Sequence, residues 1–205
     1  MKKRMTKDER AKRRKANLVM SLLIVFLMTT SILGYTSTRD STTTFRYNGY
    51  LFRQQQDSFG VKKWVTRVDG KTLIFDYSPK QLEAINLSPV IKESILATKL
   101  VMLSFDPSKT SALNYMDKAR FDITNALYSK GIRVVSGVSN KTKYYNLGII
   151  TCANASIPFP VIFLKIGNQT RITLENNCVV MEAQENYEIL ALKDRLLYSI
   201  YGIMK

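Results

Sequence analysis

The feature that most constrains this chain is an uncharged segment close to its amino terminus. No charged residue occurs between Ala16 and Thr38, and residues 18–28 are almost entirely apolar. A helix needs about 20 mostly apolar residues to cross the hydrocarbon core of a bilayer. The segment therefore predicts a transmembrane helix over residues 17–38.

A strongly basic segment precedes this apolar one. Residues 1–16 hold nine lysines and arginines but only two acidic residues. Because short segments rich in Lys and Arg stay on the cytoplasmic side, they predict a basic cytoplasmic tail over 1–16. The expected location is the cell membrane, in a single pass through the lipid bilayer. A polar spacer over 39–44 then leads to an extracytoplasmic domain over 45–205. A cleaved signal peptide is the alternative, although the apolar segment is long for one and no Ala-x-Ala follows it.

The remaining charge is moderately basic. The whole chain has a net charge of +15, of which +7 belongs to the tail and +8 to the rest. Such a balance favours contact with an anionic surface or polymer. Nucleic acid is not an expected partner, because a basic cluster beside an apolar span is explained by membrane topology and anionic lipid.

The chain contains no histidine, and this excludes several kinds of chemistry. Ser-His-Asp and Cys-His catalysis both need a histidine, as do His-ligated zinc sites. The sequence also lacks a phosphate-binding glycine loop and the Gly-x-Ser-x-Gly motif. We therefore expect no catalytic residue, no metal and no cofactor. An enzyme would have to use carboxylates, Tyr or Lys.

The two cysteines, Cys152 and Cys178, predict a disulfide, because an even number of cysteines in an oxidising compartment is typical of a bridge. Two free buried thiols, or a redox or metal-binding pair, are the alternatives. Asn140, Asn154 and Asn168 begin Asn-x-Ser/Thr sequences, which are candidate glycosylation sites in the same half of the chain. Chance is the alternative explanation for these three sites.

Two hairpins are expected in residues 45–77. Asn48-Gly49 and Asp69-Gly70 each separate two short runs rich in aromatic and β-branched residues. Such dipeptides supply the two positive φ angles of a type I′ turn. This region therefore predicts a four-stranded antiparallel meander.

Residues 78–205 predict a mixed sheet packed by two long helices. Apolar residues recur at helical spacing over residues 111–129 and 187–204, and the second of these helices carries one apolar stripe with Lys193, Asp194 and Arg195 elsewhere on its circumference. Gly167-Asn168 separates two strand-like runs and indicates a further hairpin. The expected fold is α+β: a single transmembrane helix, an antiparallel hairpin region and this mixed region.

The hairpin region alternates aromatic and basic side chains and is a candidate platform for a glycan or polyanion. A sheet with one buried face and cationic edge residues explains the same pattern. The candidate residues are Arg46, Tyr50, Arg53, Trp64 and Arg67.

The last sixty residues resemble those of uncharacterised single-pass membrane proteins of archaea. The segments that carry the resemblance are IITCANA at 149–155, PVI at 160–162, GNQT at 167–170, NNCVV at 176–180, DRLLY at 194–198 and YGIM at 201–204. The resemblance implies a glycosylated, disulfide-bearing domain at the cell surface and implies no activity.

Three hypotheses of function follow. The first is a membrane-anchored surface protein with a structural or partner-binding role, in contact with envelope proteins. The second is a domain that binds surface glycans or polyanions. The third is an envelope enzyme that uses carboxylates.

Overall fold

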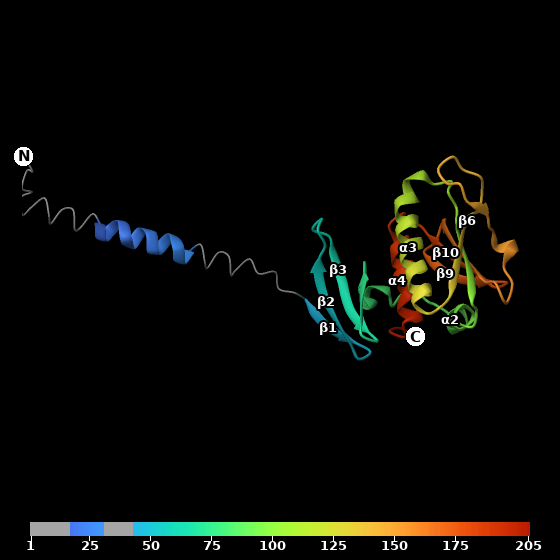
Figure 1. Ribbon diagram of the computed structural model, residues 1–205, viewed down its shortest axis with the longest axis horizontal. Helices are drawn as coiled ribbons and strands as arrows, with labels where there is room; N and C mark the ends of the chain where they lie inside the picture. The colour runs from blue at the N-terminus through green and yellow to red at the C-terminus, as the bar shows by residue number, and fades with distance from the viewer. Residues whose placement is uncertain (1–16, 31–42) are drawn as a thin grey trace, which may run out of the picture. The chain divides into compact units, whose positions relative to one another are not determined.

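The computed structural model describes residues 17–30 and 43–205. The chain divides into two units, residues 1–42 and residues 43–205. The second unit has an α+β fold with one antiparallel and one mixed sheet (Figure 1).

The prediction of a transmembrane helix over 17–38 is wrong. In the first unit the described residues, 17–30, are helical. Among the described residues, no helix has both the length and the apolar character that a bilayer span needs. The single-pass location in the cell membrane, with a cytoplasmic tail and an extracytoplasmic domain, is corrected with it. Residues 1–16 and 31–42 lie outside the described residues, and with them the tail and most of the spacer.

The antiparallel sheet has the order β1-β2-β3-β4, as its turn sequences predict. Asn48 and Gly49, and likewise Asp69 and Gly70, have positive φ angles, so both dipeptides form the expected type I′ turns. The strands are β1 Thr44–Tyr47, β2 Tyr50–Gln56, β3 Lys62–Val68 and β4 Lys71–Phe75.

The mixed sheet has the order β7-β6-β5-β8-β10-β9. Its strands are β5 Leu100–Phe105, β6 Arg133–Val138, β7 Gly148–Ile149, β8 Val161–Ile166, β9 Arg171–Glu175 and β10 Cys178–Ala183. All its pairs are parallel except that of β9 with β10. The expected hairpin at Gly167-Asn168 is therefore wrong, because β10 lies between β8 and β9. Gly167 donates its N–H to Ala183 O, and its Cα lies so close to Glu182 that a Cβ would not fit.

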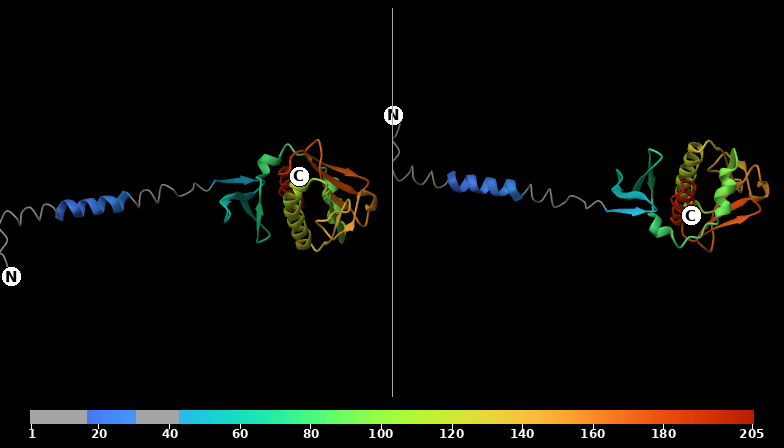
Figure 2. Two further views of the ribbon diagram at one scale, coloured as in Figure 1. Left: turned by 90° about the horizontal axis from the view of Figure 1, so that it is seen from above. Right: turned by 90° about the horizontal axis from the view of Figure 1, so that it is seen from below.

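Helices α3 and α4 lie between the two sheets, which gives three layers (Figures 1 and 2). α3 contacts β6 and α4, and α4 contacts β10. The α-helices of this unit are α2 Pro89–Leu96, α3 Leu113–Ser129 and α4 Glu188–Ile200, with 3₁₀ turns at Pro79–Leu82, Thr110–Ala112 and Cys152–Asn154.

Helix α4 is buried around its whole circumference over residues 191–200. The Tyr198 ring contacts Phe52 and Phe75 of the antiparallel sheet, with ring centroids 5.8 and 4.1 Å apart. On its other side α4 packs on β10. The expectation of a single buried stripe is therefore wrong, because this helix has a sheet on two sides.

The predicted disulfide is formed between Cys152 and Cys178. It attaches the segment after β7 to the face of the mixed sheet that is turned away from the helices, where Ile150, Val161 and Val180 make a small second core. Ser104 donates a hydrogen bond to the Ile150 carbonyl at 2.6 Å. The bridge and this hydrogen bond hold the segment across β5.

Candidate functional site

The three candidate arginines, Arg46, Arg53 and Arg67, lie on one face of the antiparallel sheet. Arg46 is opposite Leu51 in the β1–β2 pair, and Arg67 is opposite Thr72 in the β3–β4 pair. Because side chains alternate along a strand, these residues point to the side opposite Phe52 and Phe75, which are buried against the helices. We call this side the open face; it carries Arg46, Leu51, Arg53, Gln55, Val65, Arg67, Thr72 and Ile74.

The two candidate aromatic residues do not lie on the open face with the arginines. Trp64 is on the opposite side, where its ring packs edge-on against Phe45 at a centroid distance of 5.1 Å. Tyr50 is half-buried; it packs against the core and also lines the hollow beside Arg53 and Arg67. The structure thus separates Trp64 of the predicted platform, which belongs to the core, from the cationic open face, whose edge Tyr50 borders.

The open face is hollow and strongly cationic. Its cavity measures about 520 Å³ and is bordered by Arg53, Gln55 and Arg67. All three arginines are exposed. Within the described part of the chain none of them forms an ion pair, and the acidic residues of this sheet, Asp57 and Asp69, lie in its turns. An anion on this face would meet positive charge that no residue on the face neutralises.

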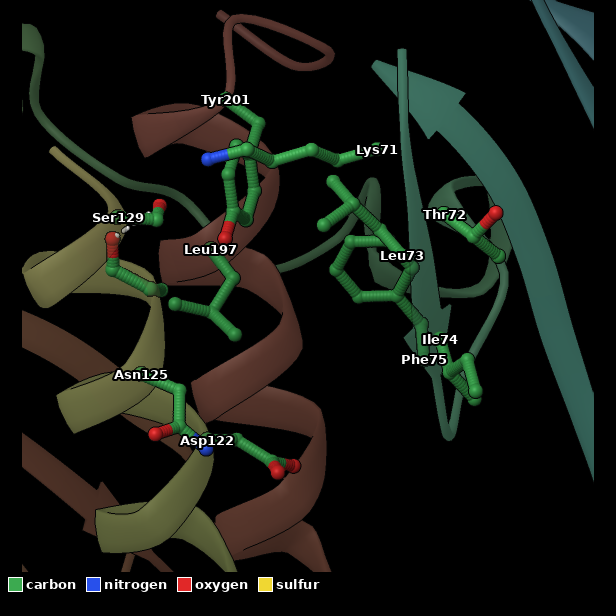
Figure 3. A pocket seen from close by; sticks show the side chains of 11 residues that line it. Lys71, Thr72, Leu73, Ile74, Phe75, Asp122, Asn125, Ser129, Leu197 and Tyr201 are labelled. Atoms are coloured by element: carbon green, nitrogen blue, oxygen red, sulfur yellow. Dashed lines mark hydrogen bonds between the residues drawn. The ribbon is translucent and has the colours of Figure 1, made fainter. Parts of the chain in front are cut away.

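A groove of about 340 Å³ runs along β4, on the side of the sheet edge that faces the helices (Figure 3). Leu73 and Phe75 line it from β4, and Leu197 lines it from α4. Asn125 lines it from α3. Figure 3 shows the apolar side chains of β4 and α4 facing one another, with the amide of Asn125 on the α3 side. The groove is therefore apolar at its centre and polar along α3.

Strand β4 is an edge strand, and its turn fixes which backbone groups are free. In a two-residue type I′ hairpin the flanking residues, here Val68 and Lys71, form a hydrogen-bonded pair. Alternation then directs the N–H and C=O groups of Thr72 and Ile74 away from β3. Neither residue has another backbone hydrogen bond within the described ranges. We call these four groups the free edge of β4.

A buried charge cluster joins the end of β4 to both long helices. Lys193 of α4 is 0% exposed, and its Nζ lies 2.5 Å from Asp194, 2.7 Å from Asp76 and 2.9 Å from Asp122. The cluster is completed by two partly exposed lysines: Lys63 contacts Asp76, and Lys118 contacts Asp76 and Asp122.

The charges of this cluster control one another's protonation. Burial of the Lys193 ammonium lowers its pKa, but the charges of Asp194, Asp76 and Asp122 raise it by more, so the pKa lies above that of a free lysine. Burial raises the pKa of Asp194 to about 6, because Lys193 and the backbone N–H of Tyr77 oppose it only in part. A lysine held protonated in this way is neither a nucleophile nor a base. The role that these contacts support is therefore stabilisation of the fold.

This cluster was not predicted from the sequence, although helix α4 carries a signal for it. Between Glu188 and Ile200 the polar residues after the first turn are Lys193, Asp194, Arg195 and Ser199. A helix that is apolar on nearly all sides is typical of a buried element. Polar residues within such a helix therefore need buried partners.

The candidate glycosylation sites lie on the surface. Asn140, Asn154 and Asn168 are all exposed, and Asn154 accepts a hydrogen bond from the Thr151 N–H. Their modification stays a prediction. Among the described residues, no group of three His, Cys, Asp or Glu side chains is placed to hold a metal ion.

Comparisons of the chain with protein-family models, with curated proteins and with solved structures give no match. The resemblance to archaeal membrane proteins stays a prediction.

Proposed function

We propose that this protein binds an anionic partner through the open face of its antiparallel sheet. The observation that carries the proposal is a set of three exposed arginines without an acidic partner on the open face: Arg46, Arg53 and Arg67. Arg53 and Arg67 border a hollow of about 520 Å³. Arginine forms bidentate hydrogen bonds with carboxylate and sulfate-like groups and suits recognition of such ligands. The proposal thus joins two of the three hypotheses of function, a partner-binding protein and a domain that binds polyanions.

The contribution of the open face to binding affinity follows from the free energy of exposed ion pairs. Each exposed pair contributes about 0–1 kcal/mol, so three arginines that act together contribute up to about 3 kcal/mol. Since about 1.4 kcal/mol corresponds to a tenfold change in affinity, replacing all three should weaken binding by about ten- to a hundredfold.

The experiment compares two triple variants of equal charge. The test variant replaces Arg46, Arg53 and Arg67 by Gln. The control replaces three exposed basic residues of the other elements by Gln: Lys109, Arg133 and Lys141. The affinity of each for poly-L-glutamate and for heparin is measured by titration calorimetry at about 50 and 150 mM salt, the range over which surface charge is progressively screened.

The proposal predicts that the test variant loses at least about tenfold in affinity for one of the two polymers, whereas the control loses less than about threefold. Equal losses in both variants would mean that net charge alone attracts the polymer. Retained affinity in the test variant would place the binding surface elsewhere. Either of these two results overturns the proposal.

A further inference from the structure

We infer that the partner is an acidic polypeptide segment that joins the antiparallel sheet as a fifth strand, beside β4. This inference rests on the proposed function, because it concerns the same sheet and names the class of anion. Its own observation is the free edge of β4, which lies between the open face and the groove.

The edge itself is open to pairing. Thr72 and Ile74 direct two N–H and two C=O groups away from β3, and no described residue bonds them. Proteins protect exposed strand edges with lysines, bulges, prolines or inward-pointing charges. β4 pairs with β3 in continuous register without a bulge, contains no proline, and exposes 63% of Ile74. Its one charged residue, Lys71, lies at the turn end of the strand, outside the stretch from Thr72 to Ile74. An edge with so little protection is the feature that β-strand addition uses.

The surroundings of the edge specify which strand would fit. Side chains of an added strand alternate between the two faces of the sheet. Those on one face would enter the groove beside Leu73 and Leu197, which favours apolar residues. Those on the other face would extend the open face next to Thr72, where Arg67 is the cross-strand neighbour. The best partner therefore alternates apolar and acidic residues.

The reach of Arg67 supports an acidic side chain at this position. Neighbouring strands lie about 4.8 Å apart, so an added strand would lie about 10 Å from β3. An arginine side chain directed along the open face spans most of this separation, and a glutamate on the added strand spans the rest. A sulfated glycan would find the same arginines but would make no use of the free edge, which is why the edge favours a polypeptide.

The probe for the experiment is an acetylated and amidated heptapeptide in which Glu and Val alternate. Its affinity for the whole protein is measured by titration calorimetry, and amide hydrogen exchange is followed at Thr72 and Ile74. We expect both amides to become protected in the complex. Unchanged exchange at both amides, with the peptide bound, overturns strand addition and leaves the proposed function standing.

Two variants of Ile74 separate the backbone from the side chain. Ile74→Pro removes an N–H that points away from β3, so it leaves the pairing of β3 with β4 intact. Ile74→Ala keeps the N–H and removes the exposed methyl groups. We expect Ile74→Pro to weaken peptide binding at least tenfold and Ile74→Ala less than threefold. Equal weakening by both variants overturns the inference.

Modified peptides keep the inference testable if Ile74→Pro does not fold. One peptide is N-methylated at its Glu residues and the other at its Val residues, so that opposite edges are blocked. Loss of binding by the Glu-methylated peptide alone indicates antiparallel addition, and loss by the Val-methylated peptide alone indicates parallel addition. Equal affinities of the two peptides overturn strand addition, whereas the Arg→Gln triple variant independently reports on the open face.

Discussion

Replacement of Lys193 by Met tests whether the buried charge cluster holds the three layers together. Lys193 is the only cation within ion-pair distance of Asp194 among the described residues. Asp76 keeps Lys63 at 2.6 Å and Lys118 at 3.0 Å, and Asp122 keeps Lys118 at 2.7 Å. Loss of the ammonium therefore leaves one uncompensated carboxylate, that of Asp194, which is 0% exposed.

The magnitude follows from the burial of this carboxylate. Removing one partner of a buried ion pair costs about 3–5 kcal/mol, because the other charge stays desolvated. Lys193→Met should lower the free energy of unfolding by this amount at pH 7. Lys118→Met is the matched control: this lysine contacts two carboxylates of the cluster but is 41% exposed, so its loss should cost about 1 kcal/mol or less.

The destabilisation caused by Lys193→Met should depend on pH in a definite direction. Without Lys193, the pKa of Asp194 rises further above its present value of about 6. A carboxyl group whose pKa is raised in the folded state contributes stability that is full below its unfolded pKa and is lost as the pH rises through its folded pKa. The destabilisation of Lys193→Met should therefore be smaller at pH 5 than at pH 7, by at least about 1 kcal/mol.

The assay is urea unfolding with the disulfide intact, followed by the fluorescence of Trp64, the single tryptophan. The double variant Lys193→Met, Asp194→Asn removes the unpaired charge while an amide oxygen still accepts the N–H groups of Asp76 and Tyr77, and it should recover at least half of the loss. A single variant within about 1 kcal/mol of the wild type at pH 7 would refute the reasoning. So would a loss that is equal at both pH values.

Two further predictions concern the segment that covers the mixed sheet. A Cβ at Gly137 would lie 2.6 Å from the Ile150 side chain, so Gly137→Ala should destabilise the protein by about 1–3 kcal/mol in the same urea assay. Gly148, which pairs with Gly137 across the strands, has nothing within 4 Å of such a Cβ. Gly148→Ala should therefore change stability by less than about 0.5 kcal/mol. Cys152 and Cys178 are separated by 26 residues, so replacing both by Ala should cost about 3.5 kcal/mol by loss of the loop constraint. Wild-type stability of the double Ala variant would contradict that account.

The parts of the fold that could be predicted from the sequence are those that local chemistry specifies. Asn48-Gly49 and Asp69-Gly70 specify their turns because few residue pairs tolerate two positive φ angles, and the hairpins follow. The hairpin at Gly167-Asn168 was wrong because β10 comes from later in the chain and takes the place beside β8. Strand order depends on packing between distant segments, which a local turn signal does not contain.

The predictions for the candidate site divide in the same way. Alternation along β3 correctly separates Trp64 from Arg67, so the pattern already contained the division between aromatic and cationic faces. The predicted meander already places its fourth strand at the edge, but whether a later strand pairs with that edge is a property of the whole topology, so the free edge of β4 was missed. The membrane span was wrong because a run of uncharged residues does not by itself specify a helix long and apolar enough for a bilayer, and the described residues contain no such helix.

Energetics explain why the free edge and the open face belong to one site. Thr72 and Ile74 offer four backbone groups, and at about 0.5–1.5 kcal/mol for each hydrogen bond they contribute about 2–6 kcal/mol. The next outward N–H, that of Asp76, already donates to Asp194 at 2.7 Å and is not free for a partner. Ordering each residue of an extended peptide costs about 1–2 kcal/mol. The free energy gained by pairing along so short an edge is therefore offset by the conformational entropy that the peptide loses. Stable strand addition at β4 therefore requires apolar burial in the groove and the charge of the arginines, and neutralising the open face should weaken peptide binding by about ten- to a hundredfold even though the edge is unchanged.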